Sequence, residues 1–474
     1  MSKLVRNILE DINLIKKYDQ HAFDYIEYPH KSFWNNDINQ DDIIKHFEKA
    51  CFEETPIMLY VHIPFCEQLC TFCICNRQIT SDYKVAEDYL YNSLFAEIDL
   101  MTKITAKFKK QFNIKEIYFG GGSPTFLKEN EFKELKNKLK QLVDFKKINQ
   151  FSVEIDPRRV DKNRLLFYAS EGVNKISFGI QDFDIKVQKK INRLQPSSII
   201  HNLLTNDVRK RFKSINFDLL IGLPAQTTET IRSTVNEVIK LRPDRIALAY
   251  LAYNPEHHPH QRHMMIGELL PDFFRRKEIF VEALECLENS PYVRTGFEHF
   301  AVPEDDVTKS LKKKRAYYNS FGATTGDCTS ILALGRSSYS TIGENIYYQN
   351  FYEQKKYQNS LKAGLIPLHR GWILSKDDKL RRKIIKELRT YFNLDIKNLN
   401  KEYKIIFEDY FKKEIKILNE FANDELLALG KNNIALSETG KHFSNLVGSI
   451  FDGYIKTPRF DEKIKPNKAI LNHK

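Results

Sequence analysis

The segment Pro56-Ile-Met-Leu-Tyr-Val-His-Ile63, continued by Pro64-Phe-Cys66-Glu-Gln-Leu-Cys70-Thr-Phe-Cys73, decides the fold of this chain. Its first eight residues form an apolar run with the length and composition of a buried strand. A loop with three cysteines in eight residues follows directly. A strand that ends in such a loop is typical of parallel βα folds, whose sites lie at the C-terminal ends of the strands.

The spacing Cys-x3-Cys-x2-Cys favours an iron–sulfur cluster. Ferredoxin-type [4Fe–4S] sites supply one thiolate per iron, so three thiolates leave one iron open, which marks a reactive site. The alternatives are a zinc knuckle and three unrelated buried thiols. Zinc sites usually add a second Cys or His pair, whereas this chain has no further Cys-x2-Cys pair. A disulfide framework is disfavoured because the chain is large and has few cysteines.

Outward from this loop, short apolar runs alternate with amphipathic stretches. We expect strands at 56–63, 114–119, 150–155, 175–179, 215–220 and 245–250. We expect helices at 82–105, 129–143, 161–170, 184–190, 197–211 and 227–241. Six strands with intervening helices predict an α/β fold with a parallel sheet.

Polar and glycine residues gather where these strands end. The loop Gly120-Gly-Gly-Ser-Pro-Thr125 follows the second strand, and Glu154 ends the third. Gln181 follows the fourth strand, and Asp218 ends the fifth. Because the C-terminal ends of parallel strands share one edge, we expect these groups to meet at one site.

The alternation stops past about residue 360. Helices are expected at 376–392 and within 400–422, then a hairpin from 426–429 and 434–436, then a helix from about 438. This order resembles a winged-helix unit, which could bind nucleic acid or simply cover the sheet domain. We favour the cover, because Lys431 is the hairpin's one basic residue.

The composition sets wider limits. The chain has 474 residues, a net charge of +12, a pI near 9.0 and a hydrophobic content of 42%. No signal peptide or membrane-span pattern is present. Seven cysteines, three of them clustered, predict a reducing cytoplasm. The basic balance suits nucleic acid, an anionic small molecule or a lysine-rich surface, and the dispersed lysines favour the last.

Several motifs in order resemble the oxygen-independent coproporphyrinogen III oxidases, a family of radical S-adenosylmethionine (SAM) enzymes. The resemblance runs from about residue 10 to 455, nearly the whole chain. The motifs are Tyr60-Val-His-Ile-Pro-Phe-Cys66, Cys70-Thr-Phe-Cys73-Ile-Cys75, Phe119-Gly-Gly-Gly-Ser-Pro-Thr125, Glu154-Ile-Asp-Pro-Arg158, Phe178-Gly-Ile-Gln-Asp-Phe183, Asp218-Leu-Leu-Ile-Gly-Leu-Pro224, Glu298-His-Phe-Ala301 and the segment 370–392.

The resemblance implies a partial (β/α)6 barrel with a mainly helical C-terminal domain. It implies oxidative decarboxylation of two coproporphyrinogen III propionates to vinyl groups, giving protoporphyrinogen IX in haem biosynthesis. We expect an N-terminal segment at 1–50, the barrel and substrate region at 51–360 and a helical cover domain at 361–474. The expected cofactors are a [4Fe–4S] cluster and SAM, and the expected electron donor is a flavodoxin or ferredoxin. We expect a cytoplasmic monomer without a membrane span.

The resemblance also implies roles for individual residues. Three cysteines would bind the cluster: Cys66, Cys70 and Cys73. Tyr60 would lie by the sulfonium. Contacts to SAM would come from Phe72, Gly121, Gly122, Ser123, Glu154, Gln181, Arg193, Asp218 and Ala252, with Tyr339 near a second SAM. Glu154 would face the amino group and Arg193 the carboxylate, Gln181 and Asp218 would bind the ribose, and Phe72 and Ala252 would contact the adenine.

Four features bear on the substrate. Cys75 matches a cysteine of the true oxidases, whereas haem-chaperone relatives usually carry another residue there. Asp24 replaces an arginine of the family, Gly326 stands where a glutamine is expected, and Tyr339 replaces an isoleucine. Two alternatives therefore stay open: a haem chaperone or haem-processing enzyme on the same scaffold, and a nucleic-acid-modifying radical SAM enzyme.

Overall fold

The computed structural model describes Leu14, Lys17, Tyr18 and residues 25–267 and 269–455; Asp24 lies outside these residues. The chain forms two compact units, each built from separate segments. The first unit, here called the barrel unit, comprises Asn35–Cys286 and Asp327–Ile373. The second, the helical unit, comprises Met1–Trp34, Leu287–Gly326 and Leu374–Lys474.

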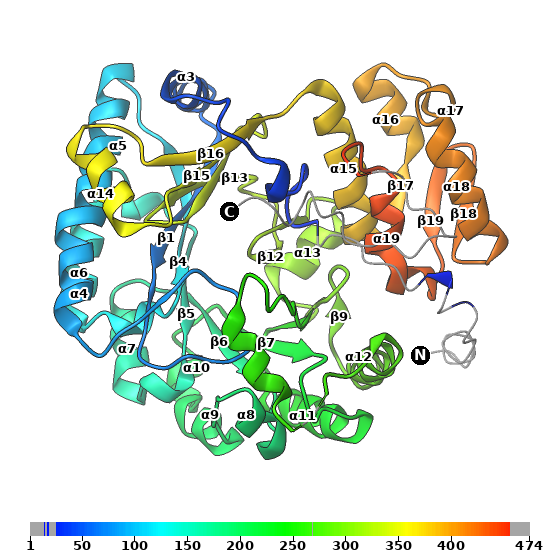
Figure 1. The fold of residues 1–474 in the computed structure, drawn as a ribbon, viewed down its shortest axis with the longest axis horizontal. Coiled ribbons are helices and arrows are strands. Elements are labelled where there is room, and N and C mark those ends of the chain that lie inside the picture. The colour runs from blue at the N-terminus through cyan, green and yellow to red at the C-terminus, as the bar shows by residue number, and fades with distance from the viewer. Residues whose placement is uncertain (1–13, 15–16, 19–24, 268, 456–474) are drawn as a thin grey trace. The chain divides into compact units, whose positions relative to one another are not determined.

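The barrel unit is built on a parallel sheet (Figure 1). All six expected strands are confirmed, and neighbours in the chain are neighbours in the sheet. They are β1 (Pro56–Ile63), β4 (Asn113–Gly121), β5 (Gln150–Ile155), β6 (Lys175–Gln181), β7 (Ser214–Ile221) and β8 (Arg245–Tyr250). Every pair among them is parallel, so their C-terminal ends form one edge.

Helices lie outside this curved sheet (Figure 1). They are α4 (Tyr83–Tyr89), α5 (Phe95–Phe108), α6 (Glu129–Leu139), α7 (Lys162–Ser170), α8 (Ile185–Lys190), α9 (Ser197–Leu203), α10 (Asn206–Arg209) and α11 (Thr228–Leu241). In α11 a capping box of Thr227 and Thr230 starts the helix. Ile231, Val235 and Val238 then recur at helical spacing and are fully buried, which gives the helix one apolar face. The expected helix 82–105 is divided by a π-helical segment at Leu90–Leu94.

A second group of strands extends the sheet beyond β1. Strand β13 (Ser330–Leu334) pairs in parallel with β1, which places β1 between two parallel neighbours. An antiparallel ribbon continues outward through β14 (Tyr339–Ile342), β15 (Ile346–Asn350) and β16 (Leu368–Ile373). Strands β13 to β16 were not predicted from the sequence. Three helices of this unit were not predicted either: α3 (Gln40–Phe52), α12 (Phe273–Glu288) and α14 (Gln354–Lys362).

The helical unit is described by itself. Its helices are α13 (Asp306–Lys312), α15 (Lys376–Tyr391), α16 (Ile396–Tyr403), α17 (Phe407–Tyr410), α18 (Lys412–Asn423) and α19 (Ser444–Ser449). The expected hairpin is present as β18 (Leu427–Leu429) and β19 (Asn433–Leu436), and β17 (Asn393–Asp395) adds a third strand. Short pairs β9 (Val293–Arg294) with β10 (His299–Ala301), and β11 (Tyr317–Asn319) with β12 (Gly322–Thr324), complete the unit.

Charged side chains also form part of the helical unit's interior. Arg389 on α15 is 1% exposed and donates to Glu298 over 3.1 Å and to the Tyr318 hydroxyl over 2.7 Å. A buried charge requires such pairing to offset its desolvation. Within the described residues, no helix has the length and apolar character that a membrane crossing requires.

Candidate active site

The strand ends of the barrel unit bring the predicted site residues into one neighbourhood. Tyr60 on β1 interacts electrostatically with both Glu154 on β5 and Tyr339 on β14. Asp218 on β7 influences the same Glu154 and is itself influenced by Arg193. These residues come from distant parts of the chain and meet because parallel strands end at one edge.

The cysteine loop leaves β1 through the short strand β2 (Phe65–Cys66), which pairs with β3 (Gln78–Ile79). The thiol of Cys66 interacts electrostatically with those of Cys70 and Cys73, so all three face one region. Among the described residues no group of three His, Cys, Asp or Glu side chains is close enough to hold a single metal ion. The separation of the three thiols therefore fits a cluster, in which each thiolate binds a different iron, better than a single zinc ion.

Three glycines at the C-terminal end of β4 let the backbone pack closely against neighbouring residues. A Cβ on Gly120 would lie 2.9 Å from the Glu154 carboxylate, and one on Gly122 would lie 2.7 Å from the Phe65 carbonyl oxygen. Gly121 has φ +123°, and a Cβ there would lie 2.7 Å from the His62 ring. A side chain at any of these positions would therefore collide with Glu154, His62 or Phe65, so only glycine allows this close packing at the strand ends.

Glu154 is held at the centre of the site by two donors. Its carboxylate accepts the Gly121 backbone N–H at 3.0 Å and the Tyr118 hydroxyl at 3.1 Å. Burial, opposed by these hydrogen bonds and reinforced by the nearby Asp218, raises the pKa of Glu154 to about 7. Near neutral pH this buried carboxyl group is only partly ionised. A cationic ligand beside it would stabilise the ionised carboxylate and lower its pKa again.

Tyr60 and His62 form a pair on one face of β1. The Tyr60 hydroxyl lies 2.8 Å from His62 Nδ1, and His62 Nε2 lies 3.0 Å from the Asn76 carbonyl oxygen. Burial lowers the pKa of His62 to about 4. The ring is therefore neutral, with Nε2–H donating to Asn76 and Nδ1 accepting from Tyr60.

Asp218 and Gln181 differ in the number of side-chain hydrogen bonds that they make within the described residues. The Asp218 carboxylate accepts Ser177 Oγ and Asn216 Nδ2, each at 2.7 Å, and burial raises its pKa. Gln181 has φ +68° at a register shift between β6 and β7. Its side-chain amide lies against Gly179 and has no hydrogen bond to another described residue, which leaves it available to a ligand.

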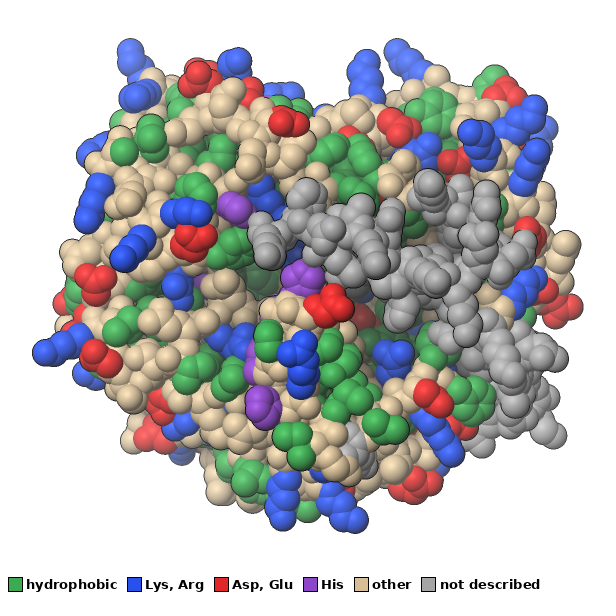
Figure 2. Space-filling view, viewed as in Figure 1, with side chains coloured by type: hydrophobic (Ala, Val, Ile, Leu, Met, Phe, Trp, Pro, Cys, Tyr) green, Lys and Arg blue, Asp and Glu red, His purple; other side chains and the backbone are tan. Residues whose placement is uncertain are grey.

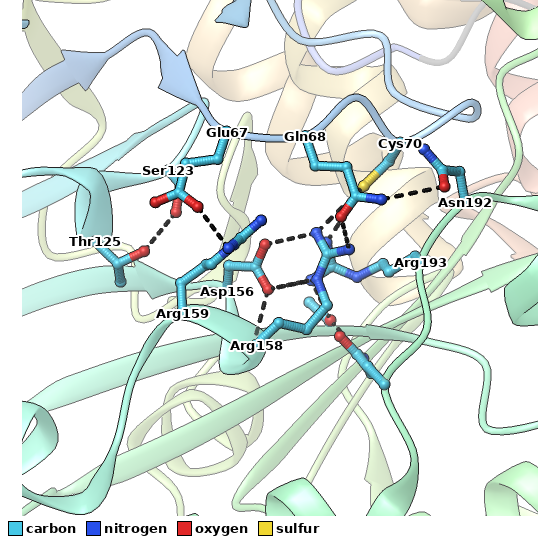
Figure 3. Close-up of polar contacts among 12 residues, drawn as sticks. Glu67, Gln68, Cys70, Ser123, Thr125, Asp156, Arg158, Arg159, Asn192 and Arg193 are labelled. Carbon is cyan, nitrogen blue, oxygen red and sulfur yellow. Dashed lines mark hydrogen bonds and ion pairs between the residues drawn. The ribbon is translucent and has the colours of Figure 1, made fainter. Parts of the chain in front are cut away.

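Arg193 and Arg158 converge on Cys70 and Asp156 (Figure 3). Arg193 Nη1 lies 3.5 Å from Cys70 Sγ, and its Nη2 donates to the Gly179 carbonyl oxygen at 2.8 Å. Its Nε is buried and has no hydrogen-bond partner among the described residues, which suits a ligand carboxylate. The sequence analysis gave Arg158 no role beyond its motif.

Gln261 is a second residue that the sequence analysis missed. Its fully buried amide donates to the carbonyl oxygens of Phe72 and Ala252, both at 2.9 Å. Its Oε1 accepts the Asn254 N–H at 2.6 Å. Gln261 thereby joins the cysteine loop to the segment after β8, and it brings together the two residues expected to contact adenine. No local pattern distinguishes it, since its partners are backbone groups.

A small cavity of about 50 Å³ opens beside the cysteine loop. Cys66 and Ser123 both line it, and Ser123 shares a 2.6 Å hydrogen bond with the Thr125 hydroxyl (Figure 3). Across the cavity Arg159 forms a 2.5 Å ion pair with Glu67. Cys75 is exposed, and its thiol interacts electrostatically with that of Cys73.

Comparison with known proteins places this site in context. The model of the radical SAM superfamily matches residues 60–238. The oxygen-independent coproporphyrinogen III oxidase of Pseudomonas aeruginosa is 32% identical over 448 residues, 94% of this chain and 96% of that protein. The same enzyme of Escherichia coli is 32% identical over 452 residues, 95% and 97% of the two chains.

A solved structure is also similar to this chain. It is coproporphyrinogen III oxidase from Escherichia coli, described as a radical SAM enzyme. The match has a TM-score of 0.84 and 33% identity, and it covers 91% of this chain and 97% of the other. The similarity therefore extends well beyond the cysteine loop and the strands around it.

Proposed function

Since this chain belongs to the family of oxygen-independent coproporphyrinogen III oxidases, we propose that it converts two propionate side chains of coproporphyrinogen III to vinyl groups. The product is protoporphyrinogen IX, and each conversion releases carbon dioxide. The observation that carries the proposal is a three-cysteine loop at the end of β1 within a match over 94% of the chain. The relatives supply the substrate class, and the loop supplies the radical chemistry.

The cofactors are a [4Fe–4S] cluster and SAM, in keeping with the radical SAM superfamily. When bound, they supply one-electron cleavage of the sulfonium and hydrogen abstraction from the propionate β-carbon. The cysteines at 66, 70 and 73 would hold the cluster. Gly121 and Gly122 would let the backbone approach SAM, with the Ser123 hydroxyl beside them.

The remaining side chains would orient SAM. Glu154 would take the amino group, for which its raised pKa makes it receptive. The unpartnered Nε of Arg193 would donate to the carboxylate. Gln181 and Asp218 would hold the ribose hydroxyls, while Phe72 and Ala252 would flank the adenine.

Tyr60 and Tyr339 would border the reacting region. The Tyr60 hydroxyl is held by the neutral His62 ring, and burial keeps the pKa of Tyr60 well above its ordinary value. Tyr60 would therefore stay protonated by the sulfonium. Tyr339 begins β14, on the side of β1 away from β4, where it would border a second SAM.

The proposal extends to partners and compartment. The reaction needs an electron for SAM cleavage, which a flavodoxin or ferredoxin would supply, and an acceptor for the substrate electron. We place the chain in a reducing cytoplasm, because its described cysteines are all free thiols, and we propose that it acts as a monomer. The net charge of +12 suits a substrate with four carboxylates.

The nucleic-acid alternative has less support. Figure 2 shows Lys and Arg side chains of the visible face spread among acidic and neutral ones, without a single basic stripe. A nucleic-acid site usually gathers its basic residues along one face. The haem-binding alternative is kept because Tyr339 departs from the family pattern.

The deciding experiment is anaerobic incubation of cluster-reconstituted protein with SAM, a reductant and coproporphyrinogen III, followed by chromatography of the pigments. We expect monovinyl and divinyl products, and none from a Cys70→Ser control. SAM cleavage without vinyl products, together with tight binding of haem, would replace the oxidase with a haem-processing function. RNA retained through purification would favour the nucleic-acid alternative.

A further inference from the structure

We propose that Arg158 raises the reduction potential of the cluster by donating a hydrogen bond to the sulfur of Cys70. This inference rests on the proposed function, in which Cys70 is a cluster ligand. Arg158 is thus a positioning residue that acts on the cluster through Cys70. In this role Arg158 sets how readily the cluster accepts an electron from the external donor.

The geometry places Arg158 against the Cys70 sulfur. Arg158 follows the end of β5, and its Nη2 lies 3.6 Å from Cys70 Sγ. Arg193 Nη1 approaches the same sulfur at 3.5 Å (Figure 3). Both distances are within hydrogen-bond range for a sulfur acceptor, whose larger radius lengthens the contact. Cys70 therefore receives two cationic donors from two different elements.

Asp156 fixes the guanidinium group of Arg158. Its Oδ1 accepts Arg158 Nε at 3.0 Å and its Oδ2 accepts Arg158 Nη2 at 2.7 Å, a bidentate fork that allows little rotation. Gln68 in the cysteine loop accepts Arg158 Nη1 at 3.3 Å. The side chain of Gln68 is itself held by Asn192 at 3.1 Å. Arg158 is thus held by Asp156 after β5 and by Gln68 in the cysteine loop.

The charges around Cys70 do not cancel. Arg158 and Arg193 carry two positive charges, and Asp156, which both of them contact, carries one negative charge. One positive charge remains beside the sulfur. The side chains of the two arginines are 11% and 8% exposed, so solvent screens this charge weakly.

The three cysteines differ in this respect. For Cys73, the described residues contain no cationic side chain that donates a hydrogen bond to the sulfur, and Arg77 acts on Cys73 and Cys66 only through its charge. For Cys66, the described residues contain no side-chain donor within hydrogen-bond distance of the sulfur. The cationic donors are therefore concentrated on Cys70, which makes the cluster environment asymmetric.

The consequence follows from electrostatics. Reduction adds one electron to the cluster, and part of that negative charge resides on the thiolate sulfurs. A positive N–H donor at a sulfur stabilises the reduced state more than the oxidised state, so the reduction potential rises. Arg158 would therefore make the cluster easier to reduce for the external donor.

The test is the cluster potential of Arg158→Met, measured by anaerobic redox titration followed by electron paramagnetic resonance. We expect the reduction equilibrium to become about tenfold less favourable, which corresponds to a potential lower by ~59 mV for one electron. Arg159→Met is the matched control, because Arg159 is the next residue and pairs with Glu67 instead. Its potential should stay at the wild-type value.

The outcomes separate the two proposals. An Arg158→Met protein with normal iron content and an unchanged potential would overturn the tuning role, even if vinyl products still form. A shift of equal size in Arg159→Met would also overturn it, since any nearby charge would then suffice. If Arg158→Met binds no iron, Arg158→Gln is measured under the same criterion. A wild-type chain that takes up no [4Fe–4S] cluster would instead refute the proposed function.

Discussion

The carboxylate of Glu154 accepts a hydrogen bond from the backbone N–H of Gly121 at 3.0 Å, which joins the ends of β4 and β5. The Glu154 carboxylate fits here because Gly120 lacks a side chain: a Cβ at that position would lie 2.9 Å from it. The hydrogen bond leaves Glu154 oriented but, because burial raises its pKa to about 7, not fully ionised near neutral pH. The first prediction follows from this state.

We expect SAM binding to weaken as the pH falls below about 7. Protonation removes the charge of Glu154, so a cationic amino group loses its partner, and the affinity should fall by up to about tenfold per pH unit. Above this pH the effect levels off. Titration calorimetry of the cluster-loaded protein from pH 5.5 to 8 measures it. Glu154→Gln should bind SAM more weakly and show a flatter profile; an identical slope would remove Glu154 from the amino-group site.

A second prediction concerns the cluster ligands. Cys66→Ser, Cys70→Ser and Cys73→Ser should each lose the cluster and SAM cleavage, since a hydroxyl is a poor ligand for iron. Iron content and visible absorption after anaerobic reconstitution report the result. Cys75→Ser is the control and should keep its iron. Normal iron in a ligand variant, or loss of iron from the control, would contradict the assignment.

A third prediction concerns the ribose site. Asp218→Ala and Gln181→Ala should leave iron content unchanged and weaken SAM binding by about 1–3 kcal/mol each, the range for a stranded polar partner. The Asp218 change also strands Ser177 and Asn216, so it should lower thermal stability as well. Gln181→Ala should not, because the side chain of Gln181 has no hydrogen bond within the described residues. Unchanged SAM affinity in both variants would exclude this site.

A fourth prediction concerns Gln261. Gln261→Leu removes bonds to the carbonyls of Phe72 and Ala252, so it should weaken SAM binding by about 1–3 kcal/mol and lower the melting temperature. Gln226→Leu is the control. Gln226 is also a buried amide: it accepts the Gly222 N–H and donates to the Leu220 carbonyl oxygen and to Asp182, but within the described residues it has no hydrogen bond to Phe72 or Ala252. The control should lose stability while keeping its SAM affinity; equal affinity losses would mean that Gln261 acts only through stability.

The fifth prediction explains a departure from the family sequence. Gly326 has φ +76°, and a Cβ at this position would lie 1.8 Å from the Arg315 carbonyl oxygen. Restoring the family's glutamine by Gly326→Gln should therefore destabilise the protein by at least about 1–3 kcal/mol. Gly364→Ala is the matched control, with φ +70° and no atom within 4 Å of the added Cβ. Denaturant unfolding that shows equal losses would exclude the contact with Arg315 as the cause.

The regular part of the fold could be predicted because its parallel strands carry strong local patterns. Strand β1 is an apolar run that is buried over most of its length, whereas β6 and β7 alternate between buried and half-buried residues. Helical periodicity fills the intervals between the strands. Strand β13 escaped because Ser330–Leu334 is only five residues long and its partner, β1, lies far away in the sequence. The antiparallel ribbon β14–β16 was not predicted for a similar reason: no local sequence pattern indicates how three short strands pair with one another.

The residues of the candidate site also divide into those that could be predicted from the sequence and those that could not. Glu154 and Arg193 were singled out through the family resemblance, and the structure places them in one neighbourhood. Arg158 ends a quoted motif but was given no role, and Gln261 lies in no motif, because what distinguishes them is a partner brought near by folding: a sulfur for Arg158 and two carbonyls for Gln261. Their assigned roles stay predictions until the variants are measured.

Strand β1 has neighbours on both sides, with Tyr60 opposite Ala333 on β13 and opposite Tyr118 on β4. Side chains along a strand alternate between faces, so one inserted or deleted residue would turn Tyr60 and His62 away from the site. Cys66 follows the end of β1 by only three residues, so the connection is too short to compensate for an inserted or deleted residue. Substitutions can therefore reshape this strand, but its length is fixed by the two ladders that hold it.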